Sequence, residues 1–125
     1  MCELTPRAVQ ELPATREAPA LARQFLRERS CPPHARQVLD EAVLLVSELV
    51  TNSVLHGGPP IIVAVDCAGD SLQVRVRDGE QALPAPRHAA STDESGRGLE
   101  LVDLISTEWG VDPEPDGKHV WFVLR

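Results

Sequence analysis

Apolar residues recur at helical spacing over the first half of the chain and at every second position in much of the second half. Residues 4–13 precede the helical part and form a short, partly apolar stretch interrupted by proline, which predicts an edge strand. A first helix follows, with Thr15 as its capping residue and Pro19 in its first turn, where proline is tolerated. Its apolar residues share one face: Ala18, Leu21, Ala22 and Phe25.

A second helix is predicted from about His34 to His56, because the sequence Ser-Cys-Pro-Pro at 30–33 ends the first one. Its apolar positions form a wide arc made of Val38, Ala42, Val46, Leu49 and Val50. The sequence Gly-Gly-Pro-Pro at 57–60 ends this helix, since glycine takes the left-handed cap and proline cannot continue a helix.

After residue 60 the spacing of apolar residues changes from the helical period to every second position. Residues 61–66 predict a buried strand, and residues 72–77 alternate apolar and polar side chains as a half-exposed strand does. A tight turn at 68–70 joins the two strands in a hairpin. Residues 79–95 lose all periodicity, which is typical of a functional lid or of a disordered segment. We therefore predict a lid at about 79–95.

Order returns in four elements: a helix from Gly98 to about Ser106, a strand at 107–112, a turn at 113–117 and a strand at 118–124. The aromatic residues of the last strand, Trp121 and Phe122, are expected to fill the core. The whole order predicts an α+β fold, a two-layer sandwich with helices on one face of a mixed, mainly antiparallel sheet. Residues 1–125 are expected to form a single domain.

Composition narrows the function classes. The 125 residues are 42% hydrophobic and 25% charged, as in ordinary globular proteins, and no apolar run approaches the ~20 residues of a membrane span. With no signal-peptide pattern at the N-terminus, we expect a cytoplasmic protein without membrane contact. The net charge of −7 argues against direct nucleic-acid binding. Three widely spaced cysteines, Cys2, Cys31 and Cys67, indicate neither a disulfide framework nor a zinc site.

Glu48 and Asn52 are the first candidates for chemistry. At helical spacing they lie about 40° apart, opposite the apolar arc, and Thr-Asn-Ser at 51–53 interrupts a helix rich in valine and leucine. An asparagine carbonyl suits Mg²⁺, and a carboxylate one turn away can take a proton from a hydroxyl or position a water. A solvated polar face is the simpler interpretation of the pair taken alone.

Two further stretches complete the pattern. Asp78-Gly79 ends the alternating strand, where Asp-Gly most often forms a turn but a buried carboxylate also accepts a hydrogen bond from the amino group of adenine. Gly96-Arg97-Gly98 leads into an apolar helix, whose N-terminus offers unpaired N–H groups to phosphate, with Arg97 adding a charge. A glycine-capped helix is the alternative there. In combination, the three stretches predict a site for ATP and Mg²⁺.

With these motifs the chain resembles the GHKL ATPase/kinase superfamily, and within it the small anti-sigma-factor serine/threonine kinases of bacteria. The sequence from Glu48 to Gly57 matches the N box of that branch, Asp78-Gly79 its first glycine box, and the sequence from Gly96 to Val102 its second. The sequence from Gly117 to Phe122 is similar to its last hairpin. The resemblance extends from about residue 12 to 125.

The resemblance implies a histidine-kinase-like ATPase domain with Glu48 as general base, Asn52 as the Mg²⁺ ligand and Asp78 as the group that binds adenine. It also implies that ATP meets Gly79 and the start of the last helix (Gly96, Arg97, Gly98 and Leu99). Ser53, His56 and Lys118 are additional candidates for the ATP site. The implied partners are an anti-anti-sigma protein of the STAS type, phosphorylated on a serine, and a sigma factor, which is held inactive. The resemblance usually also implies a homodimer.

The first glycine box departs from the family pattern. A second glycine is usual two residues after the first, whereas Glu80-Gln81-Ala82 follows Gly79 here. Our first hypothesis is a Mg-ATP-dependent protein serine/threonine kinase that regulates a transcription or stress-signalling partner. The departure supports the second, a non-catalytic switch that binds a protein when ATP is bound, and a third is an interaction domain without nucleotide. The histidine-kinase branch is disfavoured, since no helix pair carrying a phosphoacceptor histidine is expected.

Overall fold

The computed structural model describes residues 7–30, 32–68, 71–79 and 94–125. Their helices and strands are, in chain order, β1 (Ala8–Leu12), α1 (Ala18–Arg29), α2 (Pro32–His56), β2 (Ile61–Ala68), β3 (Ser71–Asp78), α3 (Glu94–Ile105), β4 (Glu108–Glu114) and β5 (Gly117–Leu124). Most of the predicted lid and of the predicted turn at 68–70, together with Cys2 and Cys31, lie outside the described residues.

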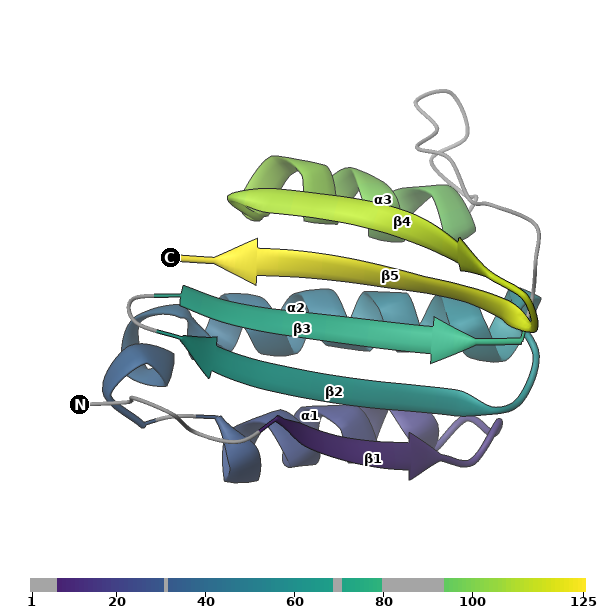
Figure 1. The fold of residues 1–125 in the computed structure, drawn as a ribbon, viewed down its shortest axis with the longest axis horizontal. Coiled ribbons are helices and arrows are strands. Elements are labelled where there is room, and N and C mark those ends of the chain that lie inside the picture. The colour runs from purple at the N-terminus through teal and green to yellow at the C-terminus, as the bar shows by residue number, and fades with distance from the viewer. Residues whose placement is uncertain (1–6, 31, 69–70, 80–93) are drawn as a thin grey trace.

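The strands form one sheet in the order β1-β2-β3-β5-β4, and the three helices cover one of its faces (Figure 1). Every strand pairing in this sheet is antiparallel. The α+β two-layer sandwich is therefore confirmed, whereas the expectation of a mixed sheet is wrong. β3 and β4 both pair antiparallel with β5, so they run in the same direction. Helix α3 lies between them in the chain and connects β3 to β4, which lies at the sheet edge beyond β5.

The core lies between the helices and the sheet. Helix α2 contributes the predicted apolar arc together with Leu45, and β3 contributes the apolar half of its alternation. Each of these side chains is at most 7% exposed: Val38, Ala42, Leu45, Val46, Leu49, Val50, Leu72, Val74 and Val76. Phe122 of β5 is fully buried in the same layer, as predicted. Trp121 is only half-buried and lies on the opposite face, where its indole covers Gly110, so its predicted place in the core is wrong.

Several predicted ends of elements shift in the structure. Helix α1 begins at Ala18 with Glu17 at its N-cap position, and Thr15 contributes its backbone carbonyl, which accepts a hydrogen bond from the Ala18 N–H at 3.0 Å. The predicted side-chain cap at Thr15 is therefore wrong. Helix α3 begins at Glu94, about one turn before the predicted start at Gly98.

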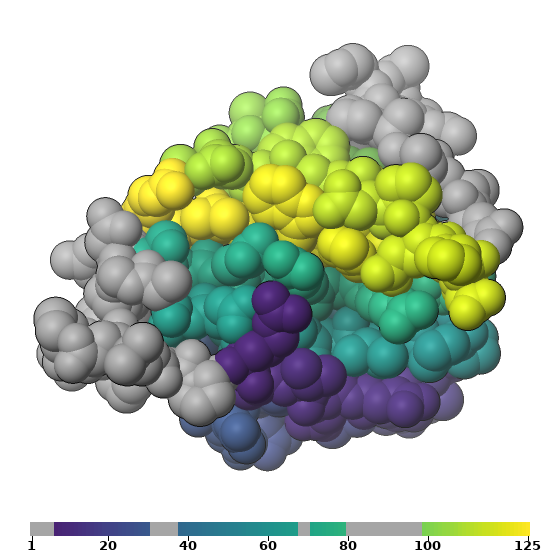
Figure 2. Space-filling model, viewed as in Figure 1, coloured from purple at the N-terminus to yellow at the C-terminus, as the bar shows by residue number. Residues whose placement is uncertain are grey.

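The face of the sheet opposite the helices is not covered by any described element. Figure 2 shows this face with β1, the β2–β3 hairpin and β5 at the molecular surface. None of the described helices, including the 25-residue α2, is both long and apolar enough to span a membrane.

Candidate functional site

Asp78 is a buried carboxylate at the end of β3. The alternation of β3 turns Asp78 toward the helices, and the residue is 4% exposed. The Ser53 hydroxyl donates a hydrogen bond to Asp78 Oδ2 at 2.7 Å. The Lys118 ammonium donates to Asp78 Oδ1 at 2.8 Å, and Lys118 is the partner of Asp78 in the β3–β5 register. Groups from α2 and β5 thus fix both oxygens of this carboxylate.

Glycines pack closely around Asp78. A Cβ at Gly57 would lie 2.5 Å from Asp78 Oδ2, so the carboxylate occupies the space that any other residue at 57 needs. Gly117 has φ +154° and packs on the Asp78 carbonyl, which excludes a side chain there as well. The Gly79 N–H donates to the Gly58 carbonyl at 2.6 Å, which ties the segment after α2 to the end of β3.

Glu48 and Asn52 lie one turn apart on α2, and both are half-buried. Asn52 directly precedes Ser53, whose hydroxyl is bonded to Asp78, so the C-terminal part of α2 is held at this site. His56 is exposed at the last position of the helix. The structure therefore places the metal-binding and proton-accepting candidates on the helix that also holds the carboxylate.

The three residues Gly96, Arg97 and Gly98 lie within the first turns of α3. Because the helix begins earlier than predicted, the backbone N–H groups without intrahelical partners belong to residues 94–97 rather than to those from 98 onward. Leu99 is 1% exposed and belongs to the core, and α3 packs against α2. Leu99 thus positions the helix, while the Arg97 side chain lies outside what the structure describes.

The chemistry of this site fits a nucleotide. A buried carboxylate against which glycines pack closely can accept hydrogen bonds from a base amino group. The Asn52 amide oxygen is a hard ligand suited to Mg²⁺, and Glu48 is a carboxylate one helical turn away. When bound, ATP would supply the transferable phosphoryl group.

The sequence indicates Asp78 as a candidate and Ser53 and Lys118 as additional ones, and the structure brings these three side chains together. The sequence shows no sign of how closely Gly57 and Gly117 approach Asp78. It predicts a helix end at the Gly-Gly pair 57–58 and places Gly117 in a turn. Both approach Asp78 through contacts between distant parts of the chain. No local pattern signals such contacts.

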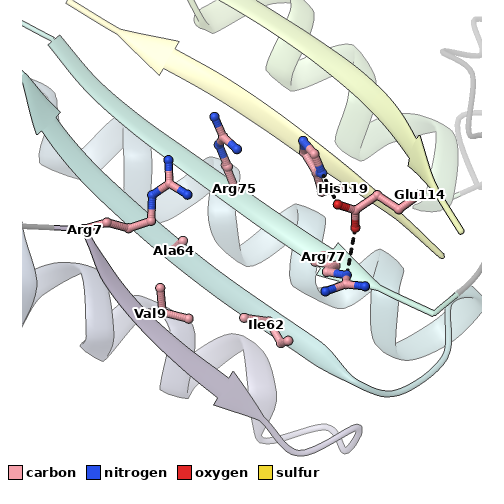
Figure 3. Close-up of a pocket in the computed structure, with 8 residues that line it drawn as sticks. All are labelled: Arg7, Val9, Ile62, Ala64, Arg75, Arg77, Glu114 and His119. Carbon is pink, nitrogen blue, oxygen red and sulfur yellow. Dashed lines mark ion pairs between the residues drawn. The ribbon is translucent and has the colours of Figure 1, made fainter. Parts of the chain in front are cut away.

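A hollow lies on the open face of the sheet, away from Asp78 (Figure 3). It has a volume of about 200 Å³ and is lined by apolar Val9, Ile62 and Ala64 and by charged or polar side chains: Arg7, Arg75, Arg77, Glu114 and His119. Glu114 lies 2.8 Å from Arg77 Nε and 3.3 Å from His119 Nδ1. None of the predicted site residues lines this hollow.

Comparisons with known proteins match nearly the whole chain to one family of domains. The model of the histidine kinase-like ATPase domain matches residues 9–124. An uncharacterised protein of Streptomyces coelicolor, SCO4941, is 32% identical over 80 residues, which cover 60% of this chain and 76% of that protein.

A solved structure also matches. The crystal structure of the RsbU and RsbW domains of Rv1364c from Mycobacterium tuberculosis superimposes with a TM-score of 0.73 at 25% identity over 97% of this chain. The chain spans about a third (32%) of the length of that solved chain. The family match covers all described strands and helices except the first residue of β1. This chain therefore belongs to the histidine kinase-like ATPase domain family.

Proposed function

We propose that this domain binds Mg-ATP and transfers the γ-phosphoryl group to a serine of an anti-anti-sigma protein of the STAS type. The observation that carries the ATP proposal is the buried Asp78 carboxylate, fixed by Ser53 and Lys118 on the helix-facing side of the sheet. The similarity to a structure that contains an RsbW domain supports the anti-sigma kinase branch. A sigma factor held inactive, a cytoplasmic location and a homodimer belong to the same proposal.

The residues have separate roles in this proposal. Asp78 accepts a hydrogen bond from the adenine amino group, Asn52 holds Mg²⁺, and the start of α3 with Gly79 lies against the ATP. Glu48 takes the proton of the serine hydroxyl as its oxygen bonds to the γ-phosphorus and the bond to ADP breaks.

Two substitutions on α2 test these roles. We expect Glu48→Ala to retain ATP affinity within about twofold while phosphoryl transfer falls by about 10²–10⁴, since general-base catalysis typically contributes this much. Asn52→Ala should weaken Mg-ATP binding itself. Calorimetry with ATP and Mg²⁺ measures affinity, and radiolabelled ATP with a panel of serine-bearing STAS-type proteins measures transfer.

Glu41→Ala is the matched control, because Glu41 is an exposed carboxylate two turns earlier on the same helix. It should change neither quantity. Transfer by Glu48→Ala at the rate of the unaltered protein would contradict the assignment of the general base.

A second candidate is a non-catalytic switch in which ATP alters a protein-binding face without phosphoryl transfer. The sequence Glu80-Gln81-Ala82 in place of a second glycine favours it. The same panel separates the two functions: ATP-dependent capture of a STAS-type protein, with no phosphoserine formed by the unaltered protein, supports the switch.

A further inference from the structure

Arg75 lies in the hollow on the open face of the sheet, and none of the described residues pairs with it (Figure 3). Its Nε atom is buried and has no hydrogen-bond partner. The other two arginines of the hollow are paired through Nε, Arg7 with Asp66 at 2.9 Å and Arg77 with Glu114 at 2.8 Å. Because a buried donor without an acceptor is costly, Arg75 is the group of this hollow that a ligand can satisfy.

The sizes of the side chains in one row across the sheet produce the hollow. Val9, Ala64 and Arg75 are register partners on β1, β2 and β3, and Ala64 is the smallest of the three. Trp121 continues the row on β5, but its indole lies over Gly110 of β4, on the side away from β3. The short side chain of Ala64 thus leaves a space that no described side chain fills, with Arg75 in its wall.

The floor of the hollow is apolar. Ile62 and Ala64 are half-buried, and Val9 is 58% exposed. A guanidinium binds a carboxylate through two parallel hydrogen bonds, and an apolar chain is stabilised where it covers apolar groups. No hydrogen bond to a described residue has to break when Arg75 turns toward such a ligand. Cation and floor together therefore fit a molecule with a carboxylate at one end of an apolar body.

The rim of the hollow limits the size of this molecule. Figure 3 shows Arg7 at one side and the ion pair of Arg77 and Glu114 at the other. A protein segment laid across the hollow would cover this ion pair and remove it from water, which is costly, whereas a small molecule fits between the charged side chains. The volume of about 200 Å³ is also below the roughly 300–1,000 Å³ of pockets for drug-sized ligands.

We propose that this hollow is a binding site for a small organic acid, a monocarboxylate with a short apolar chain. The carboxylate accepts hydrogen bonds from Arg75, and the chain lies on Val9, Ile62 and Ala64. None of the residues assigned to ATP lines the hollow, so this inference does not rest on the proposed function.

The test uses hexanoate as the probe, with the unaltered protein. Acetate has the carboxylate without the chain, hexanol has the chain without the carboxylate, and sodium chloride controls for ionic strength. In NMR titrations, hexanoate should shift the Nε–H signal of Arg75 and the methyl signals of Ala64 and Ile62 along one saturable curve. Acetate should bind about tenfold or more weakly, because it lacks the methylene groups that cover the floor. Hexanol should leave the Arg75 signal in place.

Two variants assign the binding to the hollow. Ala64→Leu fills the space, and Arg75→Gln removes the cation and identifies the Nε–H signal by its loss. Each should weaken hexanoate binding by about tenfold or more, read from the methyl signals of Ile62. Arg125→Gln is the control, because Arg125 pairs with Glu108 at 3.1 Å and does not line the hollow; it should keep the affinity.

Circular dichroism checks that both variants fold, which we expect because Ala64 and Arg75 are half-buried residues outside the core. The comparison of hexanoate with acetate in the unaltered protein decides the question even where a variant does not fold. Absence of a saturable shift at Arg75, equal affinities for hexanoate and acetate, or an unchanged hexanoate affinity in folded Arg75→Gln would each overturn the proposal. Shifts of the same signals on raising the protein concentration without ligand would assign the hollow to a second copy of the chain and also overturn it.

Discussion

At the scale of single residues, Asp78 depends on contacts from three separate parts of the chain. Ser53 comes from α2, Lys118 from β5, and Gly57 leaves the space that the carboxylate occupies. Its position is therefore determined by packing as well as by hydrogen bonds. Under the proposed function, we expect a change at any of these residues to lower nucleotide affinity more than it lowers the stability of the fold.

Gly57 and Gly58 provide a matched pair of positions to test whether packing determines the position of Asp78. An added Cβ at Gly57 would lie 2.5 Å from Asp78 Oδ2 and 2.9 Å from the Ser53 carbonyl, whereas one at Gly58 would meet nothing within 4 Å. We expect Gly57→Ala to weaken ATP binding by about tenfold or more and to lower stability by about 1–3 kcal/mol, as overpacking does. Gly58→Ala should leave both nearly unchanged.

Calorimetry and urea unfolding of the two variants measure these effects. Equal ATP affinities for Gly57→Ala and Gly58→Ala would contradict the role of Gly57 in making space for Asp78.

The residues of the site differ in how far the sequence predicts them. Glu48, Asn52 and Asp78 stand out because polar residues interrupt apolar patterns at those positions. Whether Lys118 faces the site could not be predicted, since that depends on the register between β3 and β5. Trp121 was predictable in principle: strict alternation in β5 puts Val120, Phe122 and Leu124 in the core and therefore turns Trp121 to the other face.

At the scale of elements, the sequence predicts the type of each helix and strand but not every end. Strict alternation predicts β3 well, whereas the predicted start of α3 is too late because the first turns of this helix contain two glycines. Helix α3 packs against α2, and this packing stabilises the helix although glycine has a low helix propensity. The predicted cap at Thr15 is wrong because the chain makes a turn there, in which the Thr15 carbonyl accepts a hydrogen bond from the Ala18 N–H, before the helix begins.

Helix α2 should contribute most of its stability through the face that packs on the sheet. Leu45 is fully buried, and its neighbour Leu44 is 44% exposed. We expect Leu45→Ala to lower the free energy of unfolding by about 2–5 kcal/mol, because the change removes buried apolar groups and leaves a cavity. Leu44→Ala is the control and should cost less than about 1 kcal/mol. Urea unfolding followed by circular dichroism gives both values, and similar losses would contradict the observed orientation of α2.

At the scale of the whole molecule, the two faces of the sheet have different roles. The helix-facing side carries the core and, at one end, the carboxylate of Asp78. The open face carries ion pairs between partly exposed side chains, such as Arg7–Asp66 and Arg125–Glu108, which are typically worth only 0–1 kcal/mol each. We therefore expect nucleotide binding to raise the stability of the protein through contacts on the helix-facing side of the sheet.

This difference predicts a nucleotide-dependent thermal shift. A ligand that binds only the folded state, at a hundred times its Kd, adds about 2.7 kcal/mol, which corresponds to about 10 °C in Tm for a domain of this size. We expect ATP with Mg²⁺ to raise the Tm by this amount and GTP at the same concentration to raise it far less. Asp78→Asn should lose the ATP shift, whereas Arg7→Gln, which removes an ion pair on the open face, should keep it. Equal shifts with ATP and GTP, or a full ATP shift in Asp78→Asn, would show that the carboxylate does not select the base.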